Sequence, residues 1–186
     1  MIKDGAMFML IVGTISPRKN IIRMIQAFER LNQQEVSLVI AGGINNTSKD
    51  VIEYIKRSPL RDRIIVTGFL EERELSWCYR NASILLFCSL YEGFGLPPLE
   101  AMRLNTPVIA SNITSVPEVV GDAAYLVDPY NVDQIKQGMY DLLNDSALRE
   151  SLTKKGQKQY RKFTWENTAK ETLQAFEEVL SHRRSK

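Results

Sequence analysis

Short apolar, β-branched runs alternate with longer amphipathic runs along most of this sequence, and this alternation limits the fold more than any other feature. Continuous apolar runs are typical of parallel strands that are buried on both faces. The amphipathic runs between them are long enough to cross from one parallel strand to the next. The pattern therefore predicts an α/β fold, with a parallel sheet of about six strands covered by helices on both faces.

The expected elements follow from where the periodicity changes. Strands are expected at Phe8 to Val12, Val36 to Ala41, Arg63 to Val66, Ser83 to Phe87, Pro107 to Ala110 and Ala124 to Val127. Helices are expected between them at Ile21 to Asn32, Lys49 to Arg57, Glu71 to Arg80, Leu99 to Leu104 and Val116 to Val120. The alternation then stops, and a helical C-terminal tail is expected at Val132 to Leu143, Ala147 to Arg161 and Trp165 to Leu180.

No linker rich in proline, glycine or serine divides the chain, so residues 1–186 are expected to form a single domain. The first strand begins within ten residues of Met1, and a helix-rich tail follows the sheet. The sequence therefore reads like one half of a larger α/β protein.

Charge and cysteine content exclude several classes of function. Lys and Arg total 24 against 22 Asp and Glu, a formal charge of +2, which is too balanced for a chain that coats nucleic acid or an anionic membrane. Cys78 and Cys88 lie inside apolar stretches, which argues against a disulfide framework or a zinc site and favours a cytoplasmic setting. With no Asp-x-Asp pair and a lone His182, neither a metal site nor a Ser/His/Asp triad is expected.

Glycines and charged residues gather where the expected strands end. Gly13 to Asn20 follows the first strand, Gly42-Gly43 the second, Gly68-Phe69 the third and Glu92 to Pro98 the fourth. In an open parallel sheet, ligands bind beyond the carboxyl ends of the strands, where helix N-termini point inward. The four segments therefore predict a cleft along one edge of the sheet.

The segment after the fourth strand has the features of an anion cradle. Gly93 and Gly95 let backbone N–H groups approach a ligand closely, and a Pro-Pro pair suits the first turn of the next helix. A simple glycine turn is the alternative. Glu92 and Glu100 flank the segment with seven residues between them, and each alone is also explained as a solvated or helix-capping carboxylate.

The segment after the first strand is basic. Arg18, Lys19 and Arg23 place three positive charges in six residues, which a phosphate partner would explain; a solvated basic loop is the alternative. The loop has neither the P-loop pattern nor the dinucleotide fingerprint. Phe69, beside Gly68, can meet a flat base, although a core phenylalanine is the simpler reading.

Taken in this order, the motifs resemble the C-terminal, nucleotide-sugar-binding domain of the retaining glycosyltransferases of family 4, the glycosyl transferase group 1 family. The resemblance spans nearly the whole chain, and Glu92 to Glu100 matches the family's E-x7-E motif. Its other carriers are Val12 to Asn20, Val39 to Gly43, Val66 to Leu70, Ser89 to Met102, Pro107 to Ser111 and Val116 to Ala124. It implies one Rossmann-like half of a two-domain GT-B fold.

The resemblance also implies a role for each loop. Arg18 and Lys19 hold the donor diphosphate, Glu100 bonds the ribose hydroxyls, and Glu92 is the catalytic residue, a donor-sugar binder or charge stabiliser. The implied substrate-binding residues are Gly13, Thr14, Arg18, Lys19, Gly42, Gly68, Phe69, Glu92, Gly93, Phe94, Gly95, Leu96, Glu100 and Ser111. Many family members have Arg where this chain has Thr14, so Arg18 is expected to supply the second positive charge.

The implied reaction is metal-independent and needs no cofactor: a sugar moves, with retention, from a GDP- or UDP-linked donor to a glycan or lipid-linked acceptor. The segment Pro17 to Asn20 resembles the mannosyltransferase branch and hints at GDP-mannose. The family's acceptor-binding N-terminal domain is absent from this sequence. We therefore expect little transfer by the chain alone, and contact with the inner membrane face only in a complete enzyme.

Residues 164–186 resemble the helix that crosses back to that N-terminal domain. Its apolar residues Trp165, Leu173 and Phe176 make self-association a further hypothesis.

Two other classes of function stay open. One is a stand-alone, non-catalytic nucleotide-sugar-binding module. The other is a relative of the nucleotide-sugar 2-epimerases, against which the E-x7-E segment argues.

Overall fold

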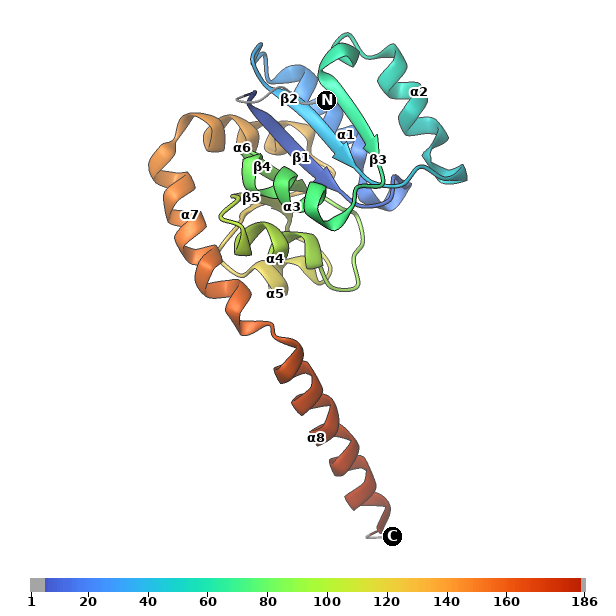
Figure 1. Cartoon of the computed structure of the whole chain (residues 1–186), viewed down its shortest axis with the longest axis vertical. Coiled ribbons are helices and arrows are strands. Elements are labelled where there is room, and N and C mark those ends of the chain that lie inside the picture. The colour runs from blue at the N-terminus through green and yellow to red at the C-terminus, as the bar shows by residue number, and fades with distance from the viewer. Residues whose placement is uncertain (1–5, 185–186) are drawn as a thin grey trace.

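The computed structural model describes residues 6–184 and contains a six-stranded sheet whose paired strands are all parallel. The order across the sheet is β3-β2-β1-β4-β5-β6 (Figure 1). The predicted α/β architecture is confirmed. The strands are β1 (Phe8–Val12), β2 (Ser37–Ala41), β3 (Ile64–Gly68), β4 (Ile84–Phe87), β5 (Val108–Ser111) and β6 (Tyr125–Val127).

The strand order reverses between β1 and β4, and this reversal positions the site. Successive strands run outward from β1 through β2 to β3, and the chain then returns to the other side of β1 to add β4, β5 and β6. The loops that follow the adjacent strands β1 and β4 therefore lead toward opposite edges of the sheet. In open parallel sheets the crevice at such a reversal is where ligands bind.

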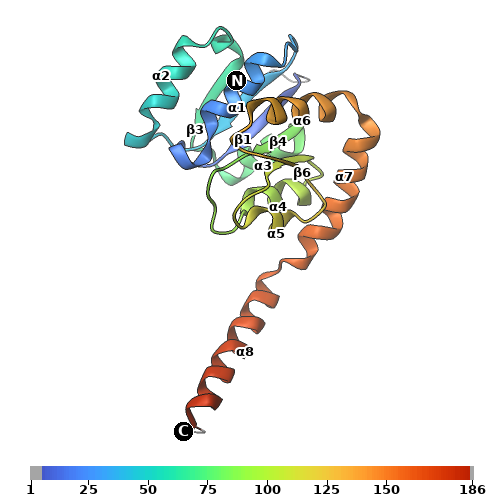
Figure 2. The same cartoon turned by 180° about the vertical axis from the view of Figure 1, so that it is seen from behind.

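Helices cover both faces of the sheet, as the sequence predicts. Figures 1 and 2 show the two faces. On one face lie α1 (Ile21–Arg30), α2 (Lys49–Arg57) and α6 (Val132–Asn144). On the other lie α3 (Glu72–Asn81), α4 (Leu96–Arg103) and α5 (Val116–Val120). Alternate residues of the fully buried β1 supply the two cores: Met9 and Ile11 face the first, and Phe8, Leu10 and Val12 the second.

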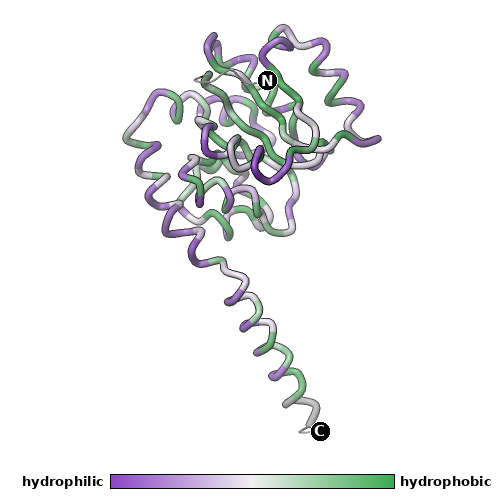
Figure 3. Tube along the Cα trace, viewed as in Figure 1, coloured by the Kyte–Doolittle hydropathy of each residue, from purple (hydrophilic) through white to green (hydrophobic). Residues whose placement is uncertain are grey.

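The helical tail has one packed part and one projecting part. Helix α7 (Ser146–Gln159) lies against α4, where the side-chain amide of Gln157 donates to the Met102 carbonyl at 2.6 Å. Helix α8 (Trp165–Arg184) then extends away from the sheet (Figures 1 and 3). All its side chains up to residue 180 are exposed. The predicted helical tail is confirmed. Residues 1–5 and 185–186 of the predicted domain lie outside the described residues.

Some predicted boundaries are wrong, for local reasons. Helix α4 begins at Leu96 rather than Leu99, because Pro97 and Pro98 lie inside its first turn, where proline's fixed φ favours the helix. Strand β3 runs to Gly68 rather than Val66, with a shift of its register against β2 between Ile40 and Ala41. Within residues 6–184, no helix combines the length and apolar character needed to cross a membrane.

Candidate functional site

The loops after β1 and β4 are fastened together at the reversal of the sheet. The backbone N–H of Leu90 donates to the Arg18 carbonyl at 2.8 Å. Asn20 is buried, and its side-chain amide donates to the carbonyls of Cys88 at 2.9 Å and Pro129 at 2.7 Å. The sequence pattern gave Asn20 no role of its own. Asn20 directly precedes α1 and has a left-handed φ of 59°, a conformation that asparagine tolerates better than most residues. An asparagine directly before an expected helix is therefore the signal that the sequence offers at this position.

Both predicted phosphate-binding cations meet the predicted catalytic carboxylate. A short 3-10 turn, Pro17–Lys19, presents Arg18 and Lys19 toward the loop after β4. The Lys19 ammonium lies 2.7 Å from Glu92 Oε1, and the Arg18 guanidinium lies 2.8 Å from Glu92 Oε2. The side chains of Lys19 and Glu92 are each 9% exposed, whereas that of Arg18 is 51% exposed. Two positive charges thus share one negative charge, which leaves a net positive cluster.

Burial and ion pairing act in opposite directions on Glu92. Burial raises the pKa of its carboxyl, but hydrogen bonds from Lys19, Ser89 and Arg18 and the charge of Lys19 together hold that pKa below its ordinary value. Glu92 is therefore ionised at neutral pH and neutralises part of the charge that a diphosphate would meet.

We expect this ion pair to make stability depend on pH. Because the pKa of Glu92 is lowered in the folded state, its contribution is present above the unfolded pKa of about 4.3 and is lost as the pH falls through the folded pKa. Glu92→Gln should therefore be less stable than the wild type at pH 7, and the gap should close below about pH 4 in urea unfolding curves. Glu150→Gln is the control, because the pKa of Glu150 is also lowered by its partner Lys154, but solvent screens this exposed pair and its gap should be much smaller. A Glu92→Gln gap of equal size at pH 7 and pH 3 would contradict the assignment.

Gly13 makes room for the lysine. Its φ of +126° is a conformation that L side chains rarely adopt, and a Cβ at this position would lie 2.9 Å from Lys19 Cε. The lysine stem then passes to the Phe87 ring, whose centroid lies 4.9 Å from the ammonium. The Lys19 side chain can therefore pass this point only because residue 13 is a glycine.

The turn from Gly93 to Leu96 offers backbone donors. In the part of the chain that the structure describes, no backbone carbonyl takes up the N–H groups of these four residues. Gly95 has a φ of +131° and precedes α4, so the turn lies at a helix N-terminus. Ser115 supports the turn, because its hydroxyl lies 2.9 Å from the carbonyls of both Glu92 and Phe94. Sequence periodicity carries no signal for Ser115.

The exits of β1, β2 and β3 line a hollow of about 180 Å³. Gly13, Thr14, Gly42 and Phe69 lie in its wall, so four of the predicted binding residues are brought together. Phe69 is 80% exposed, which excludes the reading as a core phenylalanine. Gly68, before it, has a φ of +74° and open space where a side chain would stand.

Glu100 and Ser111 lie apart from the ion-pair cluster. Glu100 is on α4 and lines a second hollow of about 240 Å³ between α3 and α4. The two hollows adjoin, because Leu75 lines both. Ser111, at the end of β5, is fully buried, and its hydroxyl has no hydrogen-bond partner within residues 6–184.

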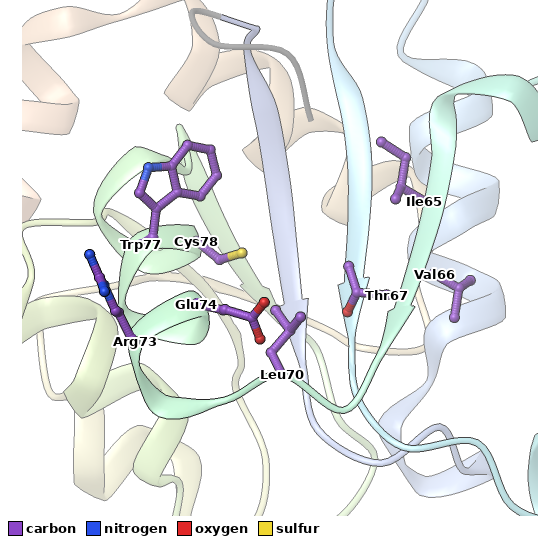
Figure 4. Close-up of a pocket in the computed structure, with 8 residues that line it drawn as sticks. All are labelled: Ile65, Val66, Thr67, Leu70, Arg73, Glu74, Trp77 and Cys78. Carbon is purple, nitrogen blue, oxygen red and sulfur yellow. The ribbon is translucent and has the colours of Figure 1, made fainter. Parts of the chain in front are cut away.

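A larger hollow of about 580 Å³ lies beside these, between β3 and α3. Figure 4 shows Trp77, Arg73 and Glu74 of α3 on one side of it and the β3 residues on the other. No predicted binding residue lines this hollow. It meets the hollow at the strand exits only through Leu70.

The fold and the site define a class of protein: an α/β domain with a net positive cluster and free backbone donors at the reversal of its sheet, suited to a phosphate-bearing ligand. The chain belongs to the glycosyl transferases group 1 family, whose model matches residues 2–159. It is the C-terminal half of a GT-B fold, and the predicted family is confirmed.

Curated relatives include mannosyltransferases. The chain is 37% identical over 172 residues to the O-antigen chain mannosyltransferase B of Escherichia coli, covering 91% of this chain and 45% of that protein. It is 32% identical over 152 residues to the O-antigen chain mannosyltransferase RfbU of Salmonella typhimurium, covering 82% of this chain and 42% of the relative. The chain thus spans less than half the length of these relatives.

Solved structures match the same half. The C-terminal domain of a glycosyl transferase group 1 family protein from Francisella tularensis superposes with a TM-score of 0.72 at 30% identity, covering 81% of this chain and 82% of that one. A sucrose-phosphate synthase from Thermosynechococcus elongatus gives a TM-score of 0.82 at 26% identity, with 96% of this chain and 46% of that one covered.

Proposed function

We propose that the chain is the donor-binding half of a retaining, metal-independent glycosyltransferase. The observation that carries the proposal is the contact of Lys19 and Arg18 with Glu92 at the reversal between β1 and β4. A buried lysine and an exposed arginine that share one carboxylate retain charge for a diphosphate. Family membership supports a nucleoside-diphosphate sugar as the substrate that carries this diphosphate.

In this proposal the cations and the free N–H groups of residues 93–96 stabilise the leaving group. The departing nucleoside diphosphate gains negative charge in the transition state, and preorganised donors favour that state over the ground state. Lys19 and Arg18 supply the positive charge that a bound metal ion supplies in metal-dependent enzymes. When the diphosphate takes these cations, the Glu92 carboxylate is released to bind the donor sugar or to stabilise positive charge on it.

The remaining roles follow the two adjoining hollows. We place the base beside Gly68 and Phe69, whose exposed ring offers a face for stacking. We place the ribose hydroxyls at Glu100, which lines the hollow between α3 and α4. Thr14 and Gly42 line the same hollow as Phe69, and we propose that they lie along the donor there. Ser111 is proposed only as a residue of the adjoining strand end, since its side chain is buried.

The relatives support a more specific donor. Several of them are named mannosyltransferases, and two of those act on an O-antigen chain by name. We therefore propose GDP-mannose as the donor and a glycan or lipid-linked acceptor, bound outside the part of the relatives that this chain matches. We propose a cytoplasmic location, with the complete enzyme at the inner membrane face, in keeping with two buried free thiols.

A transfer assay tests this function. The chain is combined with the part of the O-antigen chain mannosyltransferase B that lies outside the match, and GDP-mannose labelled with carbon-13 is supplied with an O-antigen acceptor. We expect a product that keeps the donor's anomeric configuration by NMR, and no product with Glu92→Ala. The relative's own C-terminal half, joined to the same part, is the control for assembly. Donor binding without any transfer, while that control is active, would favour the stand-alone binding module instead.

We further propose that α8 reaches the other half of the enzyme and that, without it, the isolated chain self-associates. Trp165, Leu173, Phe176 and Leu180 are each more than half exposed and follow helical spacing along α8. Light scattering should show a mass above 21.3 kDa that rises with concentration, and Leu173→Asp with Phe176→Asp should restore the monomer. A clean wild-type monomer at high concentration would contradict this.

A further inference from the structure

Glu100 has a buried partner that no sequence motif indicates. Tyr79, on α3, is 2% exposed, and its hydroxyl donates a hydrogen bond to Glu100 Oε2 at 2.6 Å. The ring is packed among the apolar residues under α3, α4 and α5. The Thr106 hydroxyl donates to the backbone carbonyl of Tyr79, which fixes the end of α3 against the loop before β5. The phenol is therefore held at its backbone and at its hydroxyl.

The phenol is a permanent donor to this carboxylate. Burial, the negative charge of Glu100 and the hydrogen bond to it raise the pKa of Tyr79 far above its ordinary value. The hydroxyl therefore keeps its proton throughout the neutral range. A protonated phenol can donate one hydrogen bond, and here it donates that bond to Glu100.

Glu100 differs from Glu92 in what holds it. Among the described residues, no Lys or Arg nitrogen lies within ion-pair distance of the Glu100 carboxylate. Its side chain is exposed and lines the hollow between α3 and α4, which adjoins the hollow at the strand exits through Leu75. An exposed glutamate on a helix surface has several rotamers, so the bond to a fixed phenol restricts which of them it adopts.

We propose that Tyr79 is a positioning residue that orients Glu100 for recognition of a ribose diol, and that it thereby favours ribonucleotides over their deoxy analogues. The hydroxyl occupies one position on Oε2 and leaves Oε1 free to accept from a sugar hydroxyl. Fixing the carboxylate before the ligand arrives lowers the ordering cost of binding. This inference rests on the proposed function, because it requires a nucleotide donor at Glu100.

The test is a titration of the chain with GDP, UDP and their 2′,3′-dideoxy analogues. For whichever ribonucleotide binds, Tyr79→Phe should weaken binding about three- to tenfold, as expected for one lost hydrogen bond. The dideoxy analogue should bind the wild type and Tyr79→Phe within about twofold of each other, since it has no diol to present. With Glu100→Gln already present, adding Tyr79→Phe should weaken ribonucleotide binding little further.

Tyr125→Phe is the matched control. The Tyr125 hydroxyl also donates to a carboxylate, Asp141 Oδ2 at 2.8 Å, but it lies between β6 and α6, away from both adjoining hollows. This variant should bind both kinds of nucleotide as the wild type does. Melting curves of both tyrosine variants establish that they are folded, and Tyr79→Phe keeps every ring contact.

The outcomes separate this inference from the function beneath it. Equal weakening of ribonucleotide and dideoxynucleotide by Tyr79→Phe would show a structural role and overturn the inference. So would unchanged ribonucleotide binding by Tyr79→Phe when Glu100→Gln weakens it. If the wild-type chain binds no nucleotide at all, the proposed function fails and this inference fails with it.

Discussion

Gly42→Ala is expected to lower the free energy of unfolding by about 4 kcal/mol or more, whereas Gly43→Ala should change it by less than about 0.5 kcal/mol. A Cβ on Gly42 would lie 1.9 Å from the Gly13 carbonyl oxygen and 2.5 Å from its carbonyl carbon. Both are backbone atoms, so no side-chain rotation relieves the overlap. A Cβ on Gly43 has no atom within 4 Å.

The loops have no room to separate. The Gly13 N–H donates to the Ala41 carbonyl at 2.9 Å, and the Ile15 N–H donates to the Gly43 carbonyl at 3.0 Å. These two bonds hold the exits of β1 and β2 together on either side of Gly42. Adding a methyl group to a rigid contact costs more stability than adding it to a contact that can relax. Urea unfolding followed by circular dichroism measures both variants; losses of similar size would show that this contact is not what requires glycine.

Lys19→Ala is expected to lower both the stability of the fold and the affinity for a nucleoside diphosphate. Lys19→Ala removes the buried cation and leaves the Glu92 carboxylate, which is 9% exposed, with only the half-exposed Arg18 as its ion-pair partner, so we expect a loss of about 2 kcal/mol of stability, less than for a buried charge with no partner. Nucleoside diphosphate affinity should fall about 100-fold, because the lysine is the buried cation at the proposed phosphate position. Chemical unfolding and calorimetric titration measure the two quantities separately.

Two further variants identify the cause. Lys19→Ala combined with Glu92→Gln should regain part of the lost stability, because no buried charge is then left without its buried partner, yet it should not regain binding. Arg30→Ala breaks an exposed ion pair with Asp133 and should cost under about 0.5 kcal/mol. If Lys19→Ala were no more destabilising than Arg30→Ala, the buried pair would not be a significant contribution to the fold.

Local patterns explain why much of this fold could be predicted. The strands are apolar on both faces, so continuous runs such as Phe8 to Val12 identify them without knowledge of their neighbours. Glycine and charge at the ends of successive strands indicate the edge where a ligand binds, since parallel strands bring those ends together. Lys19 and Arg18 were predicted in this way, and their shared site is where the sheet reverses.

Contacts between distant segments could not be predicted in the same way. The Tyr79 hydroxyl meets Glu100 from another helix, and the Ser115 hydroxyl reaches back to the loop of Glu92. Neither residue stands out in its own stretch of sequence, because a tyrosine in a helix usually signals only an apolar face. Glu92 itself was expected near the donor sugar, and its ion pairs with both cations become visible only once the loops after β1 and β4 are side by side.

A calorimetric titration of the chain with GDP, UDP, GDP-mannose and UDP-glucose in metal-free buffer shows whether this domain binds a nucleotide-sugar donor. We predict that GDP and GDP-mannose bind with micromolar to millimolar affinity and that Lys19→Ala and Glu100→Ala each weaken that binding. Binding of the uridine compounds alone would correct the donor and leave the donor half intact. No binding of any of the four, or binding that neither substitution weakens, would contradict the proposal that this chain binds the donor through Lys19 and Glu100.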